Sequence, residues 1–494
     1  MSKINVSGKN STKTTNYEAG EAYTLSPKAE LLHLASTWLF REPKFYSDAF
    51  KHEDKVKESI KKVSKKDAEF ILKLANYLRN EQYLRTASTY LLVSAANEPC
   101  LKGTPSVQKY TPKIIKRADE ITEALAMHQE IFRTDGQKGF PNSLKRGIRD
   151  AFRNFDEYQF AKYNRKGLVT FKDAIMITHP KHPSNIIKKI LDDNLQIPYT
   201  WETELSKKGN TKEVWEQLID SGKLPYMALL RNLRNILNAK VSLNHIEKVA
   251  SYISSPEAVK KSKQFPFRFL SAYKELEEVP FSTKLLNAVE KALEISFSNI
   301  PKLPGKTFIA SDVSGSMSWT SISKHSKIVP AEIGLVLSAG LNKFTEESAY
   351  GLFADTFKII QPNKDSGILQ TVRYLSKINV GGSTNGWKSI NWLNTTKTYV
   401  DRIFIFTDCQ LYDDIGYFFY NENTVRSELN KYKQNINPNV KTYVIDITGY
   451  GTVNFPESDN SVAEISGWSE KIFKFVEMSE KDTNAQVKYI EDNF

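Results

Sequence analysis

The stretch that decides the fold class of this chain is residues 308–317, which read FIASDVSGSM. An apolar, strand-like run ends here in the pattern Asp-x-Ser-x-Ser. One carboxylate, Asp312, and two hydroxyls, Ser314 and Ser316, therefore leave a single loop at the end of one expected strand. Oxygen donors of this kind suit Mg²⁺, a hard cation that keeps several waters and takes few protein ligands. The stretch predicts a metal site at the edge of an α/β sheet.

Two loops further along the chain supply oxygen donors of the same type. Thr384 lies in the turn GGSTN at residues 381–385, and Asp408 directly follows the apolar run at residues 403–407. Ligands of open α/β sheets gather at the carboxyl ends of strands, where such loops can meet. A lone Asp-x-Ser-x-Ser sequence is more often a plain turn than a metal site. Three loops together favour the metal site.

Residues 305–494 alternate strand-like and helix-like segments, as the chain of a doubly wound α/β domain does. The expected strands are residues 307–310, 349–353, 402–407, 441–447 and 472–477. Amphipathic segments at residues 328–344 and 367–377 predict helices between them. The C-terminal part is therefore predicted to be a doubly wound α/β domain.

The three loops resemble the metal-ion-dependent adhesion site of the von Willebrand factor A domain. In that family a first-loop Asp and two Ser, a second-loop Thr and a third-loop Asp form the site. The resemblance implies one divalent cation, expected to be Mg²⁺ with Mn²⁺ or Ca²⁺ as alternatives, held by Asp312, Ser314, Ser316, Thr384 and Asp408. Ser383, beside Thr384, is the alternative for that position.

Length and composition bear on the number of domains and on the cellular compartment. A chain of 494 residues is too long for one core, so two domains are expected. Its two cysteines, Cys100 and Cys409, are far apart in sequence and do not indicate a disulfide framework. No stretch approaches the ~20 uninterrupted apolar residues of a membrane span. We expect a cytoplasmic protein that does not bind membranes.

Positive charge is concentrated in the first 300 residues. They hold 49 Lys and Arg against 35 Asp and Glu, a net charge of +14, whereas residues 301–494 hold 20 against 22, a net charge of −2. A polyanion-binding module attached to a near-neutral domain has this distribution. A general enrichment of the chain in Lys and Asn is the alternative source of part of the excess. The asymmetry favours a polyanionic partner for the N-terminal part.

The first 300 residues read as one helix after another. Apolar residues recur at helical spacing in residues 31–39, 68–78, 84–96, 114–131, 143–160, 214–219, 227–237, 243–253 and 283–297. Prolines separate these segments, where helices can end. We expect a flexible tail over residues 1–20 and a HEAT-like array of helical repeats over residues 21–300. No clean sequence period names the repeat, so an irregular helical globule is the alternative.

The densest basic stretch runs from Lys138 to Lys172. On one helix, Lys145, Arg149 and Arg153 would share a face at four-residue intervals, with Arg146 beside them. An isolated cationic helix face is usually only a solvated surface. Here aromatic residues, among them Tyr158 and Tyr163, alternate with the cations. Aromatic rings that stack on bases beside cations that neutralise phosphates are typical of single-strand binding.

We therefore predict nucleic-acid contacts in two basic segments. The first segment contributes Lys145, Arg146, Arg149, Arg153, Lys162, Arg165, Lys166 and Lys172. The second is an expected amphipathic helix at residues 224–237, which contributes Arg231 and Arg234.

Four segments resemble the TROVE module of the Ro autoantigen family. They are the helix start at residues 140–148, the turn THPKHP at 178–183, ALLRNLRN at 228–235 and KQFPFR at 263–268. The order of a TROVE module and then an A domain is also that of the family, and two domains together are more specific than either motif. The resemblance covers residues 25–494. Phe171 stands where many Ro proteins have a His, so contacts with Y RNA are expected to differ there.

The resemblance implies an RNA-binding ribonucleoprotein. Ro-family proteins are helical-repeat rings closed by the A domain, and they bind small Y RNAs on the outer surface and the ends of misfolded RNAs in the central hole. The expected partners are therefore a Y-like non-coding RNA and misfolded RNA 3′ ends, in RNA quality control or processing, but not DNA. An exoribonuclease or another protein is a further expected partner, through the A domain.

Two other classes of function compete with the RNA-binding scaffold. A protein-assembly or adhesion module would use the A-domain cation to capture an acidic side chain of a partner. A Mg²⁺-dependent hydrolase is disfavoured because the loops supply one metal position, no second carboxylate cluster and no evident general base. The charge of the helical half separates the scaffold from the adhesion module, which needs no such charge. We expect a scaffold that is not an enzyme.

Overall fold

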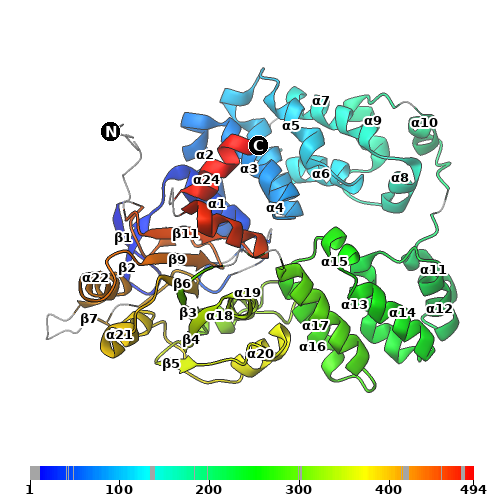
Figure 1. The fold of residues 1–494 in the computed structure, drawn as a ribbon. Helices are drawn as coiled ribbons and strands as arrows, with labels where there is room; N and C mark the ends of the chain where they lie inside the picture. The colour runs from blue at the N-terminus through cyan, green and yellow to red at the C-terminus, as the bar shows by residue number, and fades with distance from the viewer. Residues whose placement is uncertain are drawn as a thin grey trace. The chain divides into compact units, whose positions relative to one another are not determined.

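The computed structural model describes residues 12–39, 42, 44–47, 49–133, 139–182, 184–196, 198–298, 300, 303–412, 414–415, 422–457, 459–479 and 484–494. The described chain is mainly helical up to residue 300 and forms an α/β domain after it (Figure 1). It separates into two compact units. The first, the sheet unit, comprises residues 1–54 and 210–488, and the second, the helical unit, comprises residues 55–209 and 489–494.

A six-stranded sheet lies at the centre of the described part of the sheet unit. Its order is β11 (Val462–Ser466), β9 (Lys441–Asp446), β6 (Arg402–Thr407), β3 (Lys306–Asp312), β4 (Glu347–Phe353) and β5 (Phe357–Ile360). Neighbouring strands pair in parallel except β5, which runs antiparallel at the edge. β3 and β6 are buried along almost their whole length, as strands of a sheet covered on both faces are.

Helices cover both faces of this sheet. On one face, the helices α21 (Trp387–Thr396) and α22 (Val425–Asn435) share a core cluster with Phe308, Ile403 and Ile405. Side chains alternate between the faces of a strand, so Ser311 points the other way. Its hydroxyl donates to that of Ser338, on α19 (Pro330–Phe344), at 2.9 Å. The predicted doubly wound fold is thereby confirmed.

The remaining elements of the α/β domain are short. They are α18 (Gly315–Ser318), α20 (Ile368–Leu375), β7 (Asp414–Ile415), β8 (Glu422–Asn423), β10 (Thr452–Val453), η3 (Glu470–Phe473) and α23 (Lys474–Ser479). Helix α24 (Ala485–Asn493) begins in the sheet unit and ends in the helical unit. The predicted helices at residues 328–344 and 367–377 correspond to α19 and α20.

One predicted strand is wrong. Residues 472–477 form η3 and α23 instead, and the strand at the sheet edge is β11. The buried residues Ile472, Phe473, Phe475 and Val476 have helical spacing rather than alternation, and the Ser469 side chain accepts a hydrogen bond from the Lys471 amide at the start of η3. The sequence signal of β11 is weak because Glu464 interrupts its apolar run.

The N-terminal segment is ordered against the α/β domain. β1 (Lys13–Thr15) pairs with β2 (Glu21–Thr24), and β2 pairs with β10. The expectation of a flexible tail therefore fails for residues 12–20, while residues 1–11 lie outside the described residues. These strands are too short to give a clear alternation in the sequence.

Helix α1 (Pro27–Ser36) also packs against the α/β domain. Gly449 has a positive φ of 60°, and a Cβ at that position would meet the His33 carbonyl. The His33 ring Nδ1 lies 3.0 Å from Asp446 Oδ2, at the end of β9. Residues before position 54 therefore belong to the compact unit that contains the sheet, which the predicted boundary at residues 300–305 did not foresee.

The sheet unit also contains six consecutive helices. They are α12 (Lys212–Asp220), α13 (Tyr226–Asn238), α14 (Leu243–Ile253), α15 (Pro256–Ser262), α16 (Pro266–Glu277) and α17 (Thr283–Phe297). The predicted helical segments at 214–219, 227–237, 243–253 and 283–297 all lie inside them.

The helical unit contains the rest of the described helices. They are α3 (Glu69–Asn80), α4 (Arg85–Asn97), η1 (Pro99–Leu101), α5 (Ser106–Ile114), α6 (Asp119–Phe132), α7 (Asn142–Ala151), η2 (Phe152–Asn154), α8 (Glu157–Tyr163), α9 (Phe171–Thr178), α10 (Ile186–Leu191) and α11 (Trp201–Lys208). Helix α2 (Ala49–Asp67) begins in the sheet unit and continues into this one. The predicted helix at 143–160 is interrupted, because α7 ends at Ala151 and the Asp156 side chain caps α8 through the Gln159 amide.

Candidate metal site and nucleic-acid surface

The three oxygen-bearing loops meet at the carboxyl ends of β3 and β6. The first loop spans residues 312–319, the second 381–385 and the third 408–412. The Gly315 amide donates to the Gly382 carbonyl at 2.8 Å, which joins the first loop to the second. The Tyr412 amide donates to the Thr384 carbonyl at 2.8 Å, which joins the second loop to the third. The expected meeting of the loops is therefore present in the sheet unit.

Asp312 is fixed by hydrogen bonds to both of its carboxylate oxygens. Oδ1 accepts from the Ser314 amide at 2.9 Å, and Oδ2 accepts from the Thr407 hydroxyl at 2.7 Å. The hydroxyls of Ser314 and Ser316 lie 3.2 Å apart. The Asp-x-Ser-x-Ser loop thus gathers its oxygen donors in one small volume.

Asp408 is only half satisfied. Its Oδ1 accepts from the Gln410 amide at 2.9 Å, whereas its buried Oδ2 accepts no hydrogen bond of good geometry from the described residues, although the Ser316 hydroxyl interacts with the carboxylate. A buried polar group left without a partner costs about 1–3 kcal/mol, and more if it is charged. A cation is the kind of partner that would satisfy this oxygen, so the residues present fit a bound metal ion.

The two carboxyl groups are buried and interact with each other. Burial, followed by the charge of Asp312, raises the pKa of Asp408 above its usual range. Burial likewise raises the pKa of Asp312, although hydrogen bonds from Ser314 and Thr407 oppose the rise. A divalent cation would favour the ionised form of both groups, since opposite charge stabilises a carboxylate.

The second loop offers two hydroxyls, and their surroundings differ. Thr384 is buried, whereas Ser383 is exposed and its amide donates to Asp355 Oδ1. The Ser383 hydroxyl also helps to hold the pKa of Asp355 below its usual range. This arrangement favours Thr384 as the second-loop donor. The described residues contain no cluster of three or more His, Cys, Asp or Glu suited to a metal. The proposed set of two carboxylates and three hydroxyls is therefore identified only by the three loops that carry it.

Two residues at this site were not predicted. The Tyr46 hydroxyl donates to the Glu18 carboxylate, and it also interacts with Ser316 and Asp408. Both residues are hundreds of positions away from the loops in sequence, so no local pattern connects them to the site.

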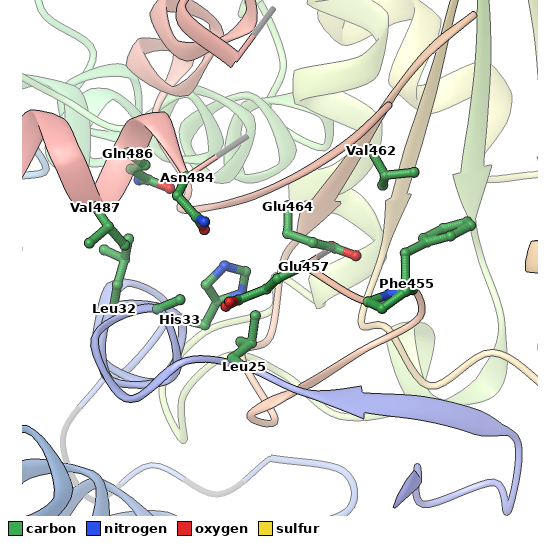
Figure 2. Close-up of a pocket in the computed structure, with 12 residues that line it drawn as sticks. Leu25, Leu32, His33, Phe455, Glu457, Val462, Glu464, Asn484, Gln486 and Val487 are labelled. Carbon is green, nitrogen blue, oxygen red and sulfur yellow. The ribbon is translucent and has the colours of Figure 1, made fainter. Parts of the chain in front are cut away.

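A pocket beside α1 is too small to hold a ligand. Figure 2 shows its lining, in which His33, Glu457 and Glu464 lie near one another. Its volume of about 20 Å³ has room for a water at most. Burial raises the pKa of Glu464 well above its usual range, although a hydrogen bond from the Phe455 backbone opposes the rise. We assign this pocket to packing.

One cationic feature of the helical unit is an open pocket between α7 and α9. Lys145 and Arg146, from α7, line it together with Asn142 and the end of α9 at residues 177–179. Its volume is about 350 Å³, and its lining contains no acidic residue. Lys145 is half-buried and Arg146 is exposed. Two of the predicted cations therefore share one concave site.

Two other predicted cations of this stretch have different surroundings. Arg149 is half-buried, and its Nε lies 3.2 Å from Asp150 Oδ1. Arg153 lies in η2, beyond the end of α7, where its Nε donates to the Lys181 carbonyl at 3.4 Å. The predicted single helical face through residues 145, 149 and 153 is therefore wrong, because the helix ends between the last two positions.

The remaining predicted cations of the helical unit are spread over α8, α9 and the loop between them. Arg165 and Lys166 are exposed in that loop. Lys172 forms an ion pair with Asp193, and the Lys162 Nζ lies 5.6 Å from the centre of the Tyr163 ring. Lys138, the first residue of the basic stretch, lies outside the described residues.

Most aromatic residues of the stretch are structural. Phe152, Phe155 and Phe160 are buried and pack together. The Tyr163 ring is covered by the Arg117 guanidinium, 4.6 Å from its centre. Tyr158 is 49% exposed, so it is the better placed of the two tyrosines for stacking on a base.

The second predicted cationic segment is α13, in the sheet unit. Arg231 is exposed, while Arg234 forms an ion pair with Glu275. Arg268, on α16, was not predicted. Burial, followed by the charge of Arg231, lowers its pKa, which places two like charges near each other. An anion would relieve that repulsion.

The fold and the loops define a class of protein that joins an array of helices to an A-type α/β domain. The chain matches the TROVE domain family over residues 21–193 and 192–300, and the Ro60 vWA domain family over residues 306–478. It therefore belongs to the TROVE family, as its sequence motifs predicted.

The relatives found by comparison include proteins much longer than this chain. The chain is 28% identical over 297 residues to telomerase protein component 1 of Rattus norvegicus and 27% identical over 297 residues to that of Mus musculus. Each match covers 43% of this chain but only 11% of the relative. The chain is also 21% identical over 447 residues to RNA-binding protein RO60 of Deinococcus radiodurans, with 80% of this chain and 82% of that protein covered.

A solved structure shows the same fold. The crystal structure of the Deinococcus radiodurans RO (RSR) protein matches with a TM-score of 0.60 and 17% sequence identity, over 91% of this chain and 99% of that one. This likeness confirms the predicted order of a helical region followed by an α/β domain of the A type. In the described part of the chain, no helix has both the length and the apolar composition required to cross a membrane.

Proposed function

We propose that this chain is an RNA-binding ribonucleoprotein scaffold that holds a small non-coding RNA by its phosphates. The observation that carries the proposal is the acid-free pocket lined by Lys145 and Arg146. Both residues lie near the N-terminal end of α7, where the helix dipole adds to their positive potential. The membership in the TROVE family and a relative that is named an RNA-binding protein support the proposal.

The partners of the pocket cations decide which of them contribute most. Among the described residues, Lys145 and Arg146 have no ion-pair partner, whereas Arg149 is paired with Asp150 and Lys172 with Asp193. A cation that is already paired must give up its partner before it can bind a phosphate. We therefore expect Lys145 and Arg146 to provide the main phosphate contacts of α7, with Arg165 and Lys166 extending the track.

Single-stranded RNA ends are the proposed ligands of this surface. Unstacked bases can reach an exposed ring such as Tyr158, whereas the deep groove of A-form RNA is closed to side chains. A Y-like RNA and the 3′ ends of misfolded RNAs provide such single strands. A role in RNA quality control or processing, in which the scaffold passes RNA to an exoribonuclease, follows from this preference.

The proposed second component is one divalent cation, Mg²⁺ with Mn²⁺ or Ca²⁺ as alternatives. Asp312, Ser314, Ser316, Thr384 and Asp408 would hold it, and the unpaired Asp408 Oδ2 supports this assignment. When bound, the cation would supply a position for an acidic group, which is the basis of the alternative function as a protein-assembly module. We expect no enzymatic activity.

Sequencing of the RNA that co-purifies with the chain tests the proposal. Wild type and a Lys145→Ala/Arg146→Ala variant would be purified in parallel from the same cells. We expect small non-coding RNA, and RNAs with single-stranded 3′ ends, to be enriched with wild type and depleted from the variant. Equal recovery of bulk RNA by both proteins would contradict the proposal.

A further inference from the structure

We propose that Glu18 and Tyr46 form a built-in acidic cap on the metal site, so that a carboxylate of this chain takes the place of an acidic side chain from a partner. The inference rests on the proposed cation site and concerns residues of the sheet unit only. It assigns a role to the N-terminal segment that neither the TROVE match nor the A-domain match contains, since Glu18 precedes both.

The turn that carries Glu18 is docked on the third metal loop. The Asn16 side chain donates to the Leu411 carbonyl at 2.7 Å, and the Tyr17 amide donates to Gln410 Oε1 at 2.8 Å. The Glu18 amide in turn donates to Asn16 Oδ1 at 3.0 Å. Gln410 and Leu411 lie two and three residues after Asp408 in the chain. The β1–β2 turn is therefore held beside the loop that carries a proposed ligand.

Tyr46 also holds the Glu18 carboxylate in place. Its hydroxyl donates to that carboxylate. Its ring stacks on the Tyr17 ring, with centroids 5.2 Å apart and planes 2° apart, and meets the Tyr450 ring edge-on at 5.5 Å. The neighbouring Phe45 ring lies 6.0 Å from Trp319 of the first metal loop. Rings from four segments of the chain thus hold the Glu18–Tyr46 pair over the loops.

The Tyr46 hydroxyl reaches the proposed ligands themselves. Besides the Glu18 carboxylate, the Tyr46 hydroxyl interacts with the Ser316 hydroxyl and with the charge of Asp408. Tyr46 therefore links Glu18 to the ligand set. Three carboxyl groups, those of Glu18, Asp312 and Asp408, gather at this place together with the hydroxyls of Ser314, Ser316 and Thr407.

The burial of the ligand set shows that the site is covered. Each of Asp312, Ser314, Ser316, Thr384 and Asp408 is at most 4% exposed. An acidic side chain of a partner could reach a cation at this place only after the covering residues had moved. Glu18 is the acidic residue that the fold places among those covering the site, and a divalent cation of this type binds carboxylates. The cap thus argues against capture of an external acid by the wild-type chain.

A calorimetric titration with Mn²⁺ tests the cap. Glu18→Gln removes the charge but keeps the size of the side chain, and we expect about a 10-fold loss of Mn²⁺ affinity, at the low end of what loss of a supporting group costs a metal site. Glu21→Gln is the matched control. Glu21 lies in the same hairpin, also accepts from a tyrosine, Tyr23, and changes the charge equally. We expect the control to keep wild-type affinity.

Acetate is the probe for access to the site. Bound Mn²⁺ speeds the relaxation of water protons when water can reach the ion. We expect faster relaxation in Glu18→Gln and in Tyr46→Phe, which removes only the hydroxyl that holds Glu18, than in wild type. Added acetate should slow that relaxation in both variants and leave wild type unchanged.

The possible results separate the cap from the cation site. If wild type binds Mn²⁺, and Glu18→Gln, Tyr46→Phe and Glu21→Gln all match it in affinity and in response to acetate, the cap is overturned and the cation site stands. If wild type does not bind Mn²⁺, both are overturned. Far-ultraviolet circular dichroism shows whether each variant is folded before its titration is read.

Discussion

The metal loops and the cationic pocket differ in how their side chains are held. The metal donors are buried and come from three loops joined by backbone hydrogen bonds, such as that from Gly315 to Gly382. The pocket cations Lys145 and Arg146 come from a single helix and line an open concavity. In the first region the position of each donor is fixed by strand register, whereas in the second the function depends on which cations have no partner. Substitutions should therefore act sharply at the loops and in graded steps at the pocket.

The largest effect is expected at the first metal loop. Asp312→Ala removes one of the two carboxylates that offset the desolvation of a cation, so Mn²⁺ affinity should fall by about 100-fold or more. Calorimetric titration measures the loss. Ser383→Ala, in the second loop, is the control, because its amide and hydroxyl are directed to Asp355 and binding should persist. Full affinity in Asp312→Ala would refute the site assignment.

The next effect concerns the cationic pocket. Lys145→Ala/Arg146→Ala removes two cations without ion-pair partners among the described residues, and hydrogen bonds to charged groups contribute about 1.5–3 kcal/mol each. Affinity for a single-stranded RNA should fall at least about 10-fold in filter binding at fixed salt. The matched variant Arg149→Ala/Lys172→Ala removes two cations that are already paired, so its affinity should fall less. A larger loss of RNA affinity in Arg149→Ala/Lys172→Ala than in Lys145→Ala/Arg146→Ala would contradict this expectation.

A pH dependence follows from the buried carboxyl pair. The pKa values of Asp312 and Asp408 are raised in the metal-free protein, so both groups hold protons at pH values where exposed carboxyls have lost them. Cation binding displaces those protons. Mn²⁺ affinity should therefore rise with pH, by about 10-fold per pH unit while one proton is released, and level off once both groups are ionised. Affinity that stays constant between pH 5 and pH 8 would disagree with this account.

The smallest effect is a gain in stability. A carboxyl whose pKa is raised in the folded state stabilises the fold below its unfolded-state pKa, and this contribution is lost as pH rises through the folded-state pKa. At neutral pH, Asp408→Asn should therefore raise the free energy of unfolding of the metal-free protein, by about 1–3 kcal/mol. Thermal unfolding in EDTA measures this change. Addition of Mg²⁺ should stabilise wild type but not the variant, and a lower unfolding temperature of the variant in EDTA would contradict the prediction.

The sequence predicted the metal loops better than the cationic surface, for a physical reason. Apolar runs such as residues 402–407 form buried parallel strands, and the residues that follow them must emerge at one sheet edge. The spacing of Lys145, Arg149 and Arg153 carried no such constraint, because Asp156 caps a new helix and ends the expected one early. Whether a cation has an acidic partner also depends on tertiary packing that local sequence does not encode.

Packing between segments that are distant in sequence explains why Glu18 and Tyr46 were not predicted at the metal site. Glu18 and Tyr46 reach the loops only because β2 pairs with β10 and α1 packs against Gly449. Neither interaction leaves a periodic pattern near residue 18 or residue 46. The same interactions explain why residues 1–54 cluster with the sheet although the TROVE match begins at residue 21.

A salt titration of RNA affinity tests the central claim most directly. Each cation that neutralises a phosphate of a single strand adds about 0.7 to the slope of log affinity against log salt, so Lys145→Ala/Arg146→Ala should lower the slope by about 1.4. Wild type should also bind an RNA with a single-stranded 3′ end more tightly than a blunt duplex of equal length. An unchanged slope in the variant, together with equal affinity of wild type for the two RNAs, would contradict the account and favour a protein-assembly function.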